Sequence, residues 1–431
     1  MGPRAILIRL LPVVLAVLWV VPSGAVPAVA ASRSDGEAML TRVRALAAAP
    51  LAGRGNGTRE ALAAADTIAR WFAAAGLAPG GSSGWFQDFT LQGGELAGRP
   101  GRNVVGRLPG RGALASRWLV VGAHYDHLGP VRGEGSAGRY HPGADDNASG
   151  VAVLVEVARL LAAGDTVDAG HPDARAVVCV AFAGEEDGLQ GSTYFVDDLP
   201  APRDSLDAML NFDSVGRLRD DRLYVAGVGT SAALPGLVAA ANAAHGLHLE
   251  ISRGGWEASD HVSFNAIGVP VLFLLTGPHE QYHTPADDWP LVAPAALVSV
   301  TDFARDLAGG LRRCPGPLVY TAVGEPPPSR RAPDSRDAGG GGTRRAWLGV
   351  IPDFVEGAGG VKLAGVMPGS PAAAAGLARG DVLVAFAGRP VADLQTYTRE
   401  LYAHAPGDTV TVEVRRGAAI VTFLVALAAR R

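Results

Sequence analysis

The sequence has only two cysteines, Cys179 and Cys314, and a single lysine, Lys362. Two cysteines can form one disulfide bond at most, and only in an oxidising compartment. Cys179 lies inside an apolar run, where a buried cysteine usually serves as a small apolar residue. The sequence alone therefore leaves open whether Cys179 and Cys314 pair.

Charged residues are also scarce, at 19% against 48% apolar residues, and the net charge is −4. This balance is typical of a globular protein and excludes a disordered one. No basic run is long enough to indicate a surface for nucleic acid. At 431 residues the chain is too long for one ordinary core, so we expect more than one domain.

The N-terminus has the pattern of a secretory signal peptide. Two arginines precede an apolar run over residues 10–21, and Ala28-Val29-Ala30 follows as a small-residue cleavage site. The alternative, a retained membrane anchor, is disfavoured because prolines interrupt the run, which is short for a bilayer span. We therefore expect residues 1–30 to be removed and the mature protein to be periplasmic or secreted, without a membrane segment.

The stretch from Trp118 to Gly150 contains the first candidate site residues. An apolar strand pattern ends at His124, and the period of two along a strand places Asp126 on the same side. This pair suits a metal ligand and a carboxylate that orients its imidazole. Asp145 follows on a loop before a strongly helical pattern. A satisfied histidine and a solvated turn would be the alternative interpretation of these residues in isolation.

Three more apolar strands end in similar residues. Glu185-Glu186 follow the run 174–184, Asp213 ends the run 206–212, and His283 lies in the loop after the run 268–277. The alternation of strands and helices predicts an α/β fold with a mostly parallel central sheet flanked by helices. Ligands bind outside the carboxyl ends of such strands, so we expect these residues to converge at one edge of the sheet.

Two histidines and three carboxylates suit a pair of divalent ions, with Zn²⁺ the best match and Asp145 shared between them. Two such ions can activate a water and polarise a carbonyl oxygen together. Of Glu185 and Glu186, one can then bind metal while the other takes the proton of the attacking water and passes it to the leaving amine.

Residues 279–283 also match H-E-x-x-H, which in single-zinc metalloproteases needs both histidines on one face of a helix. Prolines bracket these five residues on both sides, and Pro285 pushes Thr284 away from helical angles. We therefore expect a loop here, with His279 near the site at most.

Six motifs in this order, HYDHLG, GADDNASG, AGEEDGLQGS, NFDSVGR, SDHVSF and QYHTPADDW, resemble the co-catalytic di-zinc aminopeptidases that include bacterial leucyl aminopeptidase. The resemblance covers about residues 36–312 and implies a di-zinc exopeptidase fold with two Zn²⁺ per chain. Position by position, it implies one zinc bound by His124 and Asp213, another bound by Glu186 and His283, and Asp145 as the bridge. It implies Glu185 as the general base.

The resemblance implies three further features. A non-proline cis peptide often follows the bridging aspartate, which places it at Asp145-Asp146. Tyr282 matches a tyrosine that in some relatives hydrogen-bonds the developing oxyanion. The SDHVSF motif lies near the pocket in the family, but it carries no assigned role here.

Residues 319–343 have no apolar periodicity and are rich in Pro and Gly, which predicts a flexible linker after a catalytic domain over residues 31–318. Residues 344–431 resemble a bacterial PDZ domain, a small β-rich fold, with PGSPAAAAGLARGD as the most specific stretch. The resemblance implies that Leu348-Gly349-Val350 binds the C-terminal carboxylate of a peptide added as an extra strand. A PDZ domain that only packs on the catalytic domain is the alternative.

The sequence thus favours an exported di-zinc metallo-aminopeptidase that acts on peptides or proteins with a free N-terminus. A carboxypeptidase of the same fold would need a basic residue for the substrate carboxylate, and Arg217 or Arg253 could supply it. A glutaminyl cyclase of this fold typically uses one zinc, which the five-ligand set argues against. A peptide-binding protein with a decayed site is a fourth alternative, against which the complete ligand set and Glu185 argue.

Overall fold

The computed structural model describes Gly2 and residues 33–132, 135–164, 171–199, 201–324, 346–352, 359–367 and 369–429. The predicted signal peptide, apart from Gly2, and the predicted linker from residue 325 onward lie outside the described residues.

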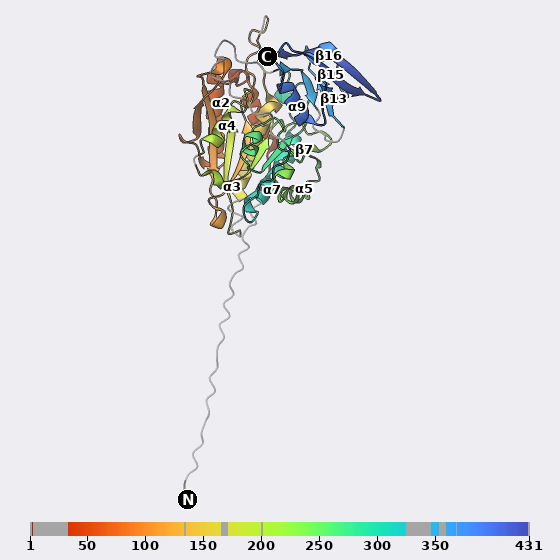
Figure 1. Ribbon diagram of the computed structural model, residues 1–431. Helices are drawn as coiled ribbons and strands as arrows, with labels where there is room; N and C mark the ends of the chain where they lie inside the picture. Colours follow the sequence, from red (N-terminus) through yellow and green to blue (C-terminus); the bar gives the residue numbers. More distant parts are fainter. Residues whose placement is uncertain are drawn as a thin grey trace.

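A nine-stranded sheet forms the centre of the larger domain (Figure 1). Its strand order is β1-β3-β5-β4-β6-β9-β7-β8, with β2 paired to β3. The four central strands β5, β4, β6 and β9 run parallel, while β3 and β7 join them antiparallel. The strands are β1 (Ala78–Pro79), β2 (Phe86–Thr90), β3 (Pro100–Leu108), β4 (Trp118–His124), β5 (Ala176–Phe182), β6 (Leu206–Phe212), β7 (Arg222–Ala226), β8 (His248–Ile251) and β9 (Val271–Leu275).

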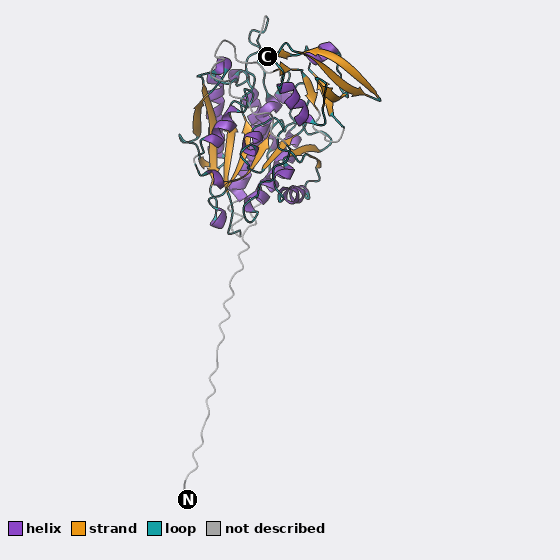
Figure 2. Cartoon of the chain, viewed as in Figure 1, coloured by secondary structure: helices purple, strands orange, loops and turns teal. Residues whose placement is uncertain are grey.

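Helices cover both faces of this sheet (Figure 2). One face carries α1, α2, α3, α5 and α7, whose apolar residues share the main core, and the other carries α4 and α6. The helices are α1 (Gly36–Ala47), α2 (Arg59–Ala74), α3 (Gly150–Gly164), α4 (Gln190–Asp197), α5 (Leu234–Asn242), α6 (His261–Asn265) and α7 (Pro294–Arg313).

The apolar runs of the central strands follow from this layering. In β4, Leu119 and Val121 belong to the core on one face, whereas Trp118 and Val120 belong to the core on the other. A strand buried on both faces needs apolar residues at every position, so it reads as a continuous run in the sequence. Burying one Leu or Val side chain stabilises the fold by about 1.5–3 kcal/mol.

Helix α3 is apolar on nearly all sides because it lies in the middle of the main core. Together with the preceding turn, it is the one helical stretch among the described residues that is long and apolar enough to span a membrane. Since 78% of its apolar window is buried inside the protein, it has the character of a core helix.

The predicted α/β fold with a mostly parallel sheet is confirmed. Strands β7 and β8 were not predicted, because neither forms a long apolar run and β8 is partly exposed at the sheet edge. The two cysteines are free thiols, and Cys179 is buried in β5, where burial raises its pKa to about 12.

The C-terminal unit is the expected small β-rich domain with a core of its own. Its main sheet has the order β11-β12-β13-β15-β16, with β14 paired to β13, and β10 pairs with β17. Gly376, at φ 92°, ends helix α8. The elements are β10 (Ala346–Trp347), β11 (Val350–Pro352), β12 (Val361–Val366), α8 (Pro371–Ala375), β13 (Val382–Phe386), β14 (Arg389–Pro390), α9 (Leu394–Tyr402), β15 (Thr409–Arg416), β16 (Ala419–Ala426) and β17 (Ala428–Ala429).

The larger domain extends beyond its predicted end at residue 318. The Tyr320 hydroxyl donates a hydrogen bond to Asn265, and the Thr321 N–H donates one to the carbonyl of Thr230. The Trp256 indole N–H donates to the carbonyl of Val323. These bonds attach residues 320–323, which were expected to belong to the linker, to the larger domain.

A buried ion pair holds the end of α7 against the sheet. Arg175 is fully buried, and its Nε lies 2.6 Å from Asp207 Oδ2. The same guanidinium donates to the carbonyls of Leu311 and Cys314. Arg117 pairs with the other oxygen of Asp207 from a side chain that is 30% exposed.

We expect Arg175→Met to destabilise the larger domain by about 3–5 kcal/mol, because it leaves the Asp207 carboxylate buried with a weaker partner. Arg117→Met is the matched control and should cost about 1 kcal/mol. The midpoint of urea unfolding, followed on the transition of the larger domain, measures both. Equal effects of the two substitutions would contradict the assignment of Arg175 as the main partner.

Candidate metal centre

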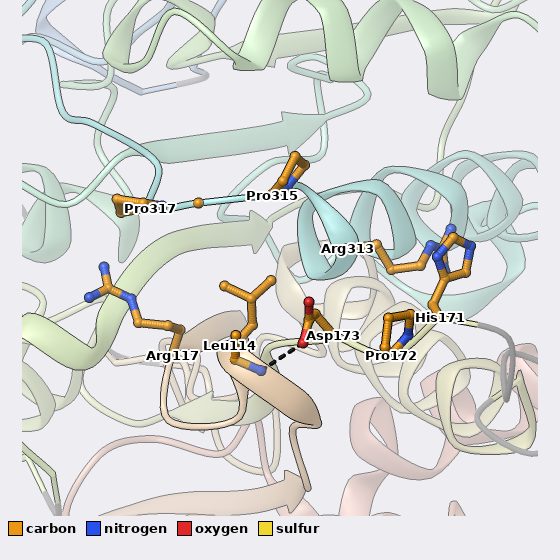
Figure 3. Close-up of a pocket in the computed structure, with 10 residues that line it drawn as sticks. Leu114, Arg117, His171, Pro172, Asp173, Arg313, Pro315 and Pro317 are labelled. Carbon is orange, nitrogen blue, oxygen red and sulfur yellow. Dashed lines mark hydrogen bonds between the residues drawn. The ribbon is translucent and has the colours of Figure 1, made fainter.

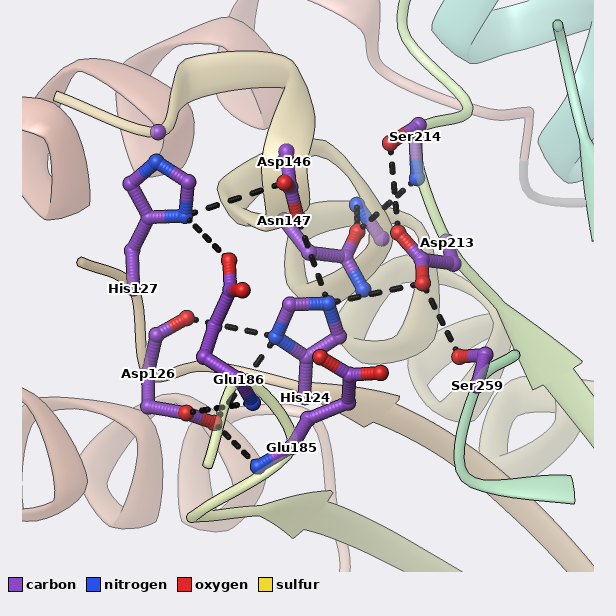
Figure 4. A network of polar contacts seen from close by, with 12 residues as sticks. His124, Asp126, His127, Asp146, Asn147, Glu185, Glu186, Asp213, Ser214 and Ser259 are labelled. Carbon is purple, nitrogen blue, oxygen red and sulfur yellow. Dashed lines mark hydrogen bonds and ion pairs between the residues drawn. The ribbon is translucent and has the colours of Figure 1, made fainter. Parts of the chain in front are cut away.

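Two of the expected residues, His124 and Asp213, form a first cluster with Asp146 at the carboxyl edge of the sheet (Figure 4). His124 ends β4, and its Nε2 lies 3.3 Å from Asp146 Oδ1 and 3.5 Å from Asp213 Oδ2. Burial by itself lowers the pKa of His124, but the carboxylates of Asp213 and Asp146 outweigh burial and raise that pKa well above its ordinary value. The carboxylates of this cluster therefore favour a positive charge between them.

A second cluster lies beside the first and shares Asp146 with it. His283 Nε2 is 2.9 Å from Asp146 Oδ2 and 3.2 Å from Glu186 Oε1. His127 Nδ1 is 2.8 Å from the same Glu186 oxygen. Because Asp146 turns one oxygen to each cluster, it is the carboxylate placed to bridge two ions.

This geometry corrects the prediction that Asp145 is the shared residue. Asp145 Oδ1 accepts a hydrogen bond of 2.7 Å from the Gly216 N–H, and its Oδ2 lies 3.3 Å from His279 Nε2. The carboxylates of Asp145 and Asp146 therefore serve different partners, and only the second lies between the clusters. The cis peptide bond is likewise one residue further on, at Asp146-Asn147 rather than at Asp145-Asp146.

Asp126 has a different role from the predicted one. His124 Nδ1 lies 3.2 Å from the backbone carbonyl oxygen of Asp126 and 3.7 Å from its carboxylate, so the carbonyl fixes the imidazole. The carboxylate instead accepts hydrogen bonds from the backbone N–H groups of Glu185 and Glu186, each at 3.2 Å. Asn56 donates to it as well, at 2.6 Å. Asp126 thus positions the loop that follows β5.

Glu185 has its carboxylate on the side of the first cluster (Figure 4). Burial raises the pKa of Glu185 well above its ordinary value, and the neighbouring Glu186 and Asp213 carboxylates raise it further against the opposing effect of His124. A carboxylate with a raised pKa is suited to accept a proton from water.

The loop that contains H-E-x-x-H forms turns and no helix, as expected. His283 adopts a left-handed φ of 58°, an uncommon conformation for a residue other than glycine and one found at functional sites. The Tyr282 ring stacks on the His283 imidazole, with centroids 3.9 Å apart and planes 17° apart. Tyr282 is therefore next to the second cluster.

Several residues that support the site were not predicted. Asp287 accepts the backbone N–H groups of Asp145 and Asp146 at 3.0–3.2 Å, and so fixes the turn that carries the shared carboxylate. Ser259 donates a hydrogen bond of 2.9 Å to Asp213 Oδ2. This bond gives the SDHVSF motif a positioning role, through its first residue.

The fully buried Arg54 joins two loops of the site. It donates hydrogen bonds to the carbonyl of Tyr125, after β4, and to the carbonyls of Pro142 and Gly143, before the shared aspartate. Burial lowers its pKa to about 10. Arg54, Asp287 and Ser259 act through contacts between distant segments, so no local pattern reveals these roles. His127, Asp287 and Ser259 nevertheless lie within motifs that the sequence analysis quotes.

The two clusters fit a pair of zinc ions. Zinc bonds of about 2.0–2.1 Å at the tetrahedral angle hold ligand atoms about 3.3 Å apart. The distances of 3.3 and 3.5 Å in the first cluster, and of 2.9 and 3.2 Å from His283 in the second, lie close to that spacing. The buried Asp146 Oδ2 has no partner in hydrogen-bonding geometry, and a buried carboxylate oxygen is costly unless a cation or a donor satisfies it.

A cavity of about 480 Å³ lies elsewhere (Figure 3). Arg117 and Asp173, which line it, come just before β4 and β5, so it opens at the amino ends of the strands. Ligands of open α/β sheets bind at the opposite edge. The cavity contains none of the predicted site residues.

The chain matches two known families, peptidase family M28 over residues 103–308 and the PDZ domain over residues 346–427. Residues 103–308 are a peptidase family M28 domain. The M28 match includes every predicted ligand, from His124 to His283. The PDZ match confirms the assignment of the C-terminal unit.

Three curated relatives are similar to parts of the chain. A probable zinc metalloprotease of Pyrenophora tritici-repentis is 38% identical over 25% of this chain and 20% of its own length. Aminopeptidase YwaD of Bacillus subtilis is 27% identical over 47% of this chain and 43% of its own. A probable leucine aminopeptidase of Trichophyton verrucosum is 29% identical over 47% of this chain and 56% of its own. The chain thus spans less than two thirds of each relative.

Two solved structures share the fold of the M28 domain. The zinc aminopeptidase BSAP of Bacillus subtilis has a TM-score of 0.51 and 17% identity, covering 65% of this chain and 96% of its own. A glutaminyl cyclase of Porphyromonas gingivalis has a TM-score of 0.51 and 20% identity, covering 64% of this chain and 98% of its own. At this level of identity the similarity shows the fold, and it does not separate the two activities.

Replacing either aspartate by asparagine tests which one is shared between the clusters. We expect Asp146→Asn to weaken zinc binding by more than about 100-fold, beyond the usual 10–100-fold effect of residues that only support a ligand. Asp145→Asn should cost less than about tenfold, because an amide oxygen can still accept the Gly216 N–H. Competition with a chelator measures both affinities. A larger loss for Asp145→Asn would restore the sequence-based assignment.

Proposed function

We propose that the protein is an exported metallo-aminopeptidase that holds two zinc ions per chain and hydrolyses the first peptide bond of substrates with a free N-terminus. The observation that carries the proposal is the shared carboxylate of Asp146 between two clusters of ligands, with Glu185 beside them. The similarity of the M28 domain to zinc metalloproteases and aminopeptidases supports the choice of metal and reaction.

His124, Asp146 and Asp213 would hold one zinc, and Asp146, Glu186 and His283 the other. When bound, the ions supply Lewis acidity for the scissile carbonyl and lower the pKa of a water. Glu185 takes the proton of the attacking water and delivers it to the nitrogen of the leaving amine. Asp126 keeps Glu185 in place by accepting a hydrogen bond from the Glu185 backbone N–H, and Tyr282, whose ring stacks on His283, would donate a hydrogen bond to the developing oxyanion.

The PDZ domain is proposed to bind the C-terminus of a peptide or protein at Leu348-Gly349-Val350. Gly349, at φ 80°, lies beside the Ser370 side chain, and Val350 begins strand β11. A strand with a free edge can accept a peptide as an added strand. Export is proposed from the signal-peptide pattern at the N-terminus, and the mature protein would be periplasmic or secreted.

Comparing a peptide with a free N-terminus, its N-acetylated form and its C-terminally amidated form tests the proposed activity. We expect the purified protein with zinc to release the first residue from the free and the amidated peptides and to leave the acetylated peptide intact. Mass spectrometry of the products identifies the bond that breaks.

Two other outcomes would replace the proposal. Cleavage of the acetylated peptide at its C-terminus would indicate a carboxypeptidase, with Arg217 as the first residue to test. Loss of ammonia from an N-terminal glutamine without hydrolysis would indicate a glutaminyl cyclase.

The two adjacent glutamates should behave differently when each is replaced by glutamine. Glu185→Gln should retain both zinc ions yet lose about 10²–10⁴ in kcat, the usual contribution of a positioned general base. Glu186→Gln should instead lower the zinc content. Measuring kcat and metal content for both variants checks the assignment, and the reverse pattern would exchange the two roles.

A further inference from the structure

His127 lies at the second cluster, although no motif comparison assigns it a role. It follows Asp126 on the loop after β4, and its side chain is fully buried. We infer that His127 is a fourth protein ligand of the second zinc, in addition to Asp146, Glu186 and His283. This inference rests on the two-metal site of the proposed function.

The distances around His127 support direct ligation. Its Nδ1 lies 2.8 Å from Glu186 Oε1 and 3.8 Å from Asp146 Oδ2. His283 Nε2 lies 3.2 Å from the same Glu186 oxygen and 2.9 Å from the same Asp146 oxygen, so the four distances lie on both sides of the spacing of about 3.3 Å that a tetrahedral zinc imposes. Figure 4 shows the His127 ring pointing toward Glu186 and Asp146.

A buried imidazole needs partners for its ring nitrogens, and neither nitrogen of His127 has one in hydrogen-bonding geometry. At 2.8 Å from Glu186 Oε1, Nδ1 is close enough for a hydrogen bond, but it is not aligned for one. A metal ion between the two would satisfy the nitrogen and the oxygen at once. The neighbouring His141, by contrast, is engaged through its Nδ1 with the Gly129 carbonyl at 3.1 Å.

The backbone leaves room for this imidazole. Gly143 has a left-handed φ of 55°, and a Cβ atom added there would lie 2.5 Å from Cγ and Cδ2 of His127. Any other residue at position 143 would push the ring away from the cluster. The absence of a side chain at Gly143 thus allows His127 to lie where it can reach the metal.

A fourth ligand makes the two metal positions unequal. The second ion would be enclosed by His127, His283, Asp146 and Glu186, which is the ligand count of a closed zinc site. The first ion would have three protein ligands, the count of catalytic sites that keep a position for water or substrate. Since Glu185 lies on the side of the first cluster, the proton acceptor would lie beside the ion that has fewer protein ligands.

Nuclear magnetic resonance on protein loaded with cadmium-113 tests the inference, with nitrogen-15 in the histidines. A one-bond coupling between cadmium and a ring nitrogen arises only through a coordinate bond. We expect three coupled imidazoles in the unmodified protein, from His124, His127 and His283, and two in His127→Gln. His141→Gln is the matched control and should retain all three.

The competing interpretation is that His127 only hydrogen-bonds to Glu186. It predicts two coupled imidazoles in the unmodified protein, and that count alone would overturn the inference even if His127→Gln failed to fold. Chelator competition adds a second readout, in which His127→Gln should lower the affinity for one zinc by more than about 100-fold, beyond the usual 10–100-fold effect of residues that only support a ligand. Binding of a single ion in the unmodified protein would instead refute the two-metal site of the proposed function.

Discussion

The structure depends on an excess of carboxylates at one edge of a parallel sheet. Asp126, Asp146, Glu185, Glu186 and Asp213 come together there, and the buried Arg54 beside them gives its N–H groups to backbone carbonyls. Buried carboxylates without compensating charge are costly, so this edge is stable only with donors or cations between them. Metal binding and the stability of the site are therefore coupled.

The surrounding residues orient these carboxylates through hydrogen bonds and do not cancel their negative charge. Asp126 holds the glutamate loop, Asp287 holds the turn of the shared aspartate, and Ser259 holds Asp213, each through a hydrogen bond of 2.9–3.2 Å. Replacing residues that orient ligands in this way usually lowers metal affinity by about 10–100-fold. The carboxyl ends of β4, β5, β6 and β9 supply the rigid base on which these loops stand.

The fold does not choose the reaction, because zinc aminopeptidases and glutaminyl cyclases both share it with this chain. Function is argued from the site instead. A carboxylate that reaches two ligand clusters favours two ions over one, and a buried glutamate beside them can accept the proton of an attacking water. The presence of a peptidase domain and a PDZ domain in one chain suits a peptide substrate.

The sequence by itself determined the strand pattern of the central sheet, the residue types at the strand ends and the absence of a helix at H-E-x-x-H. These features follow from local rules, namely the two-residue period of strands, continuous apolar runs and the effect of proline. The tertiary structure decided between Asp145 and Asp146, because two adjacent aspartates differ only in the partners that distant segments bring to them, Gly216 and His279 for Asp145 and the two clusters for Asp146. It also placed His127 against Glu186, since the approach of these two loops depends on the hydrogen bonds from the Glu185 and Glu186 N–H groups to Asp126, and the lack of a side chain at Gly143 leaves room for the ring, which no local pattern records.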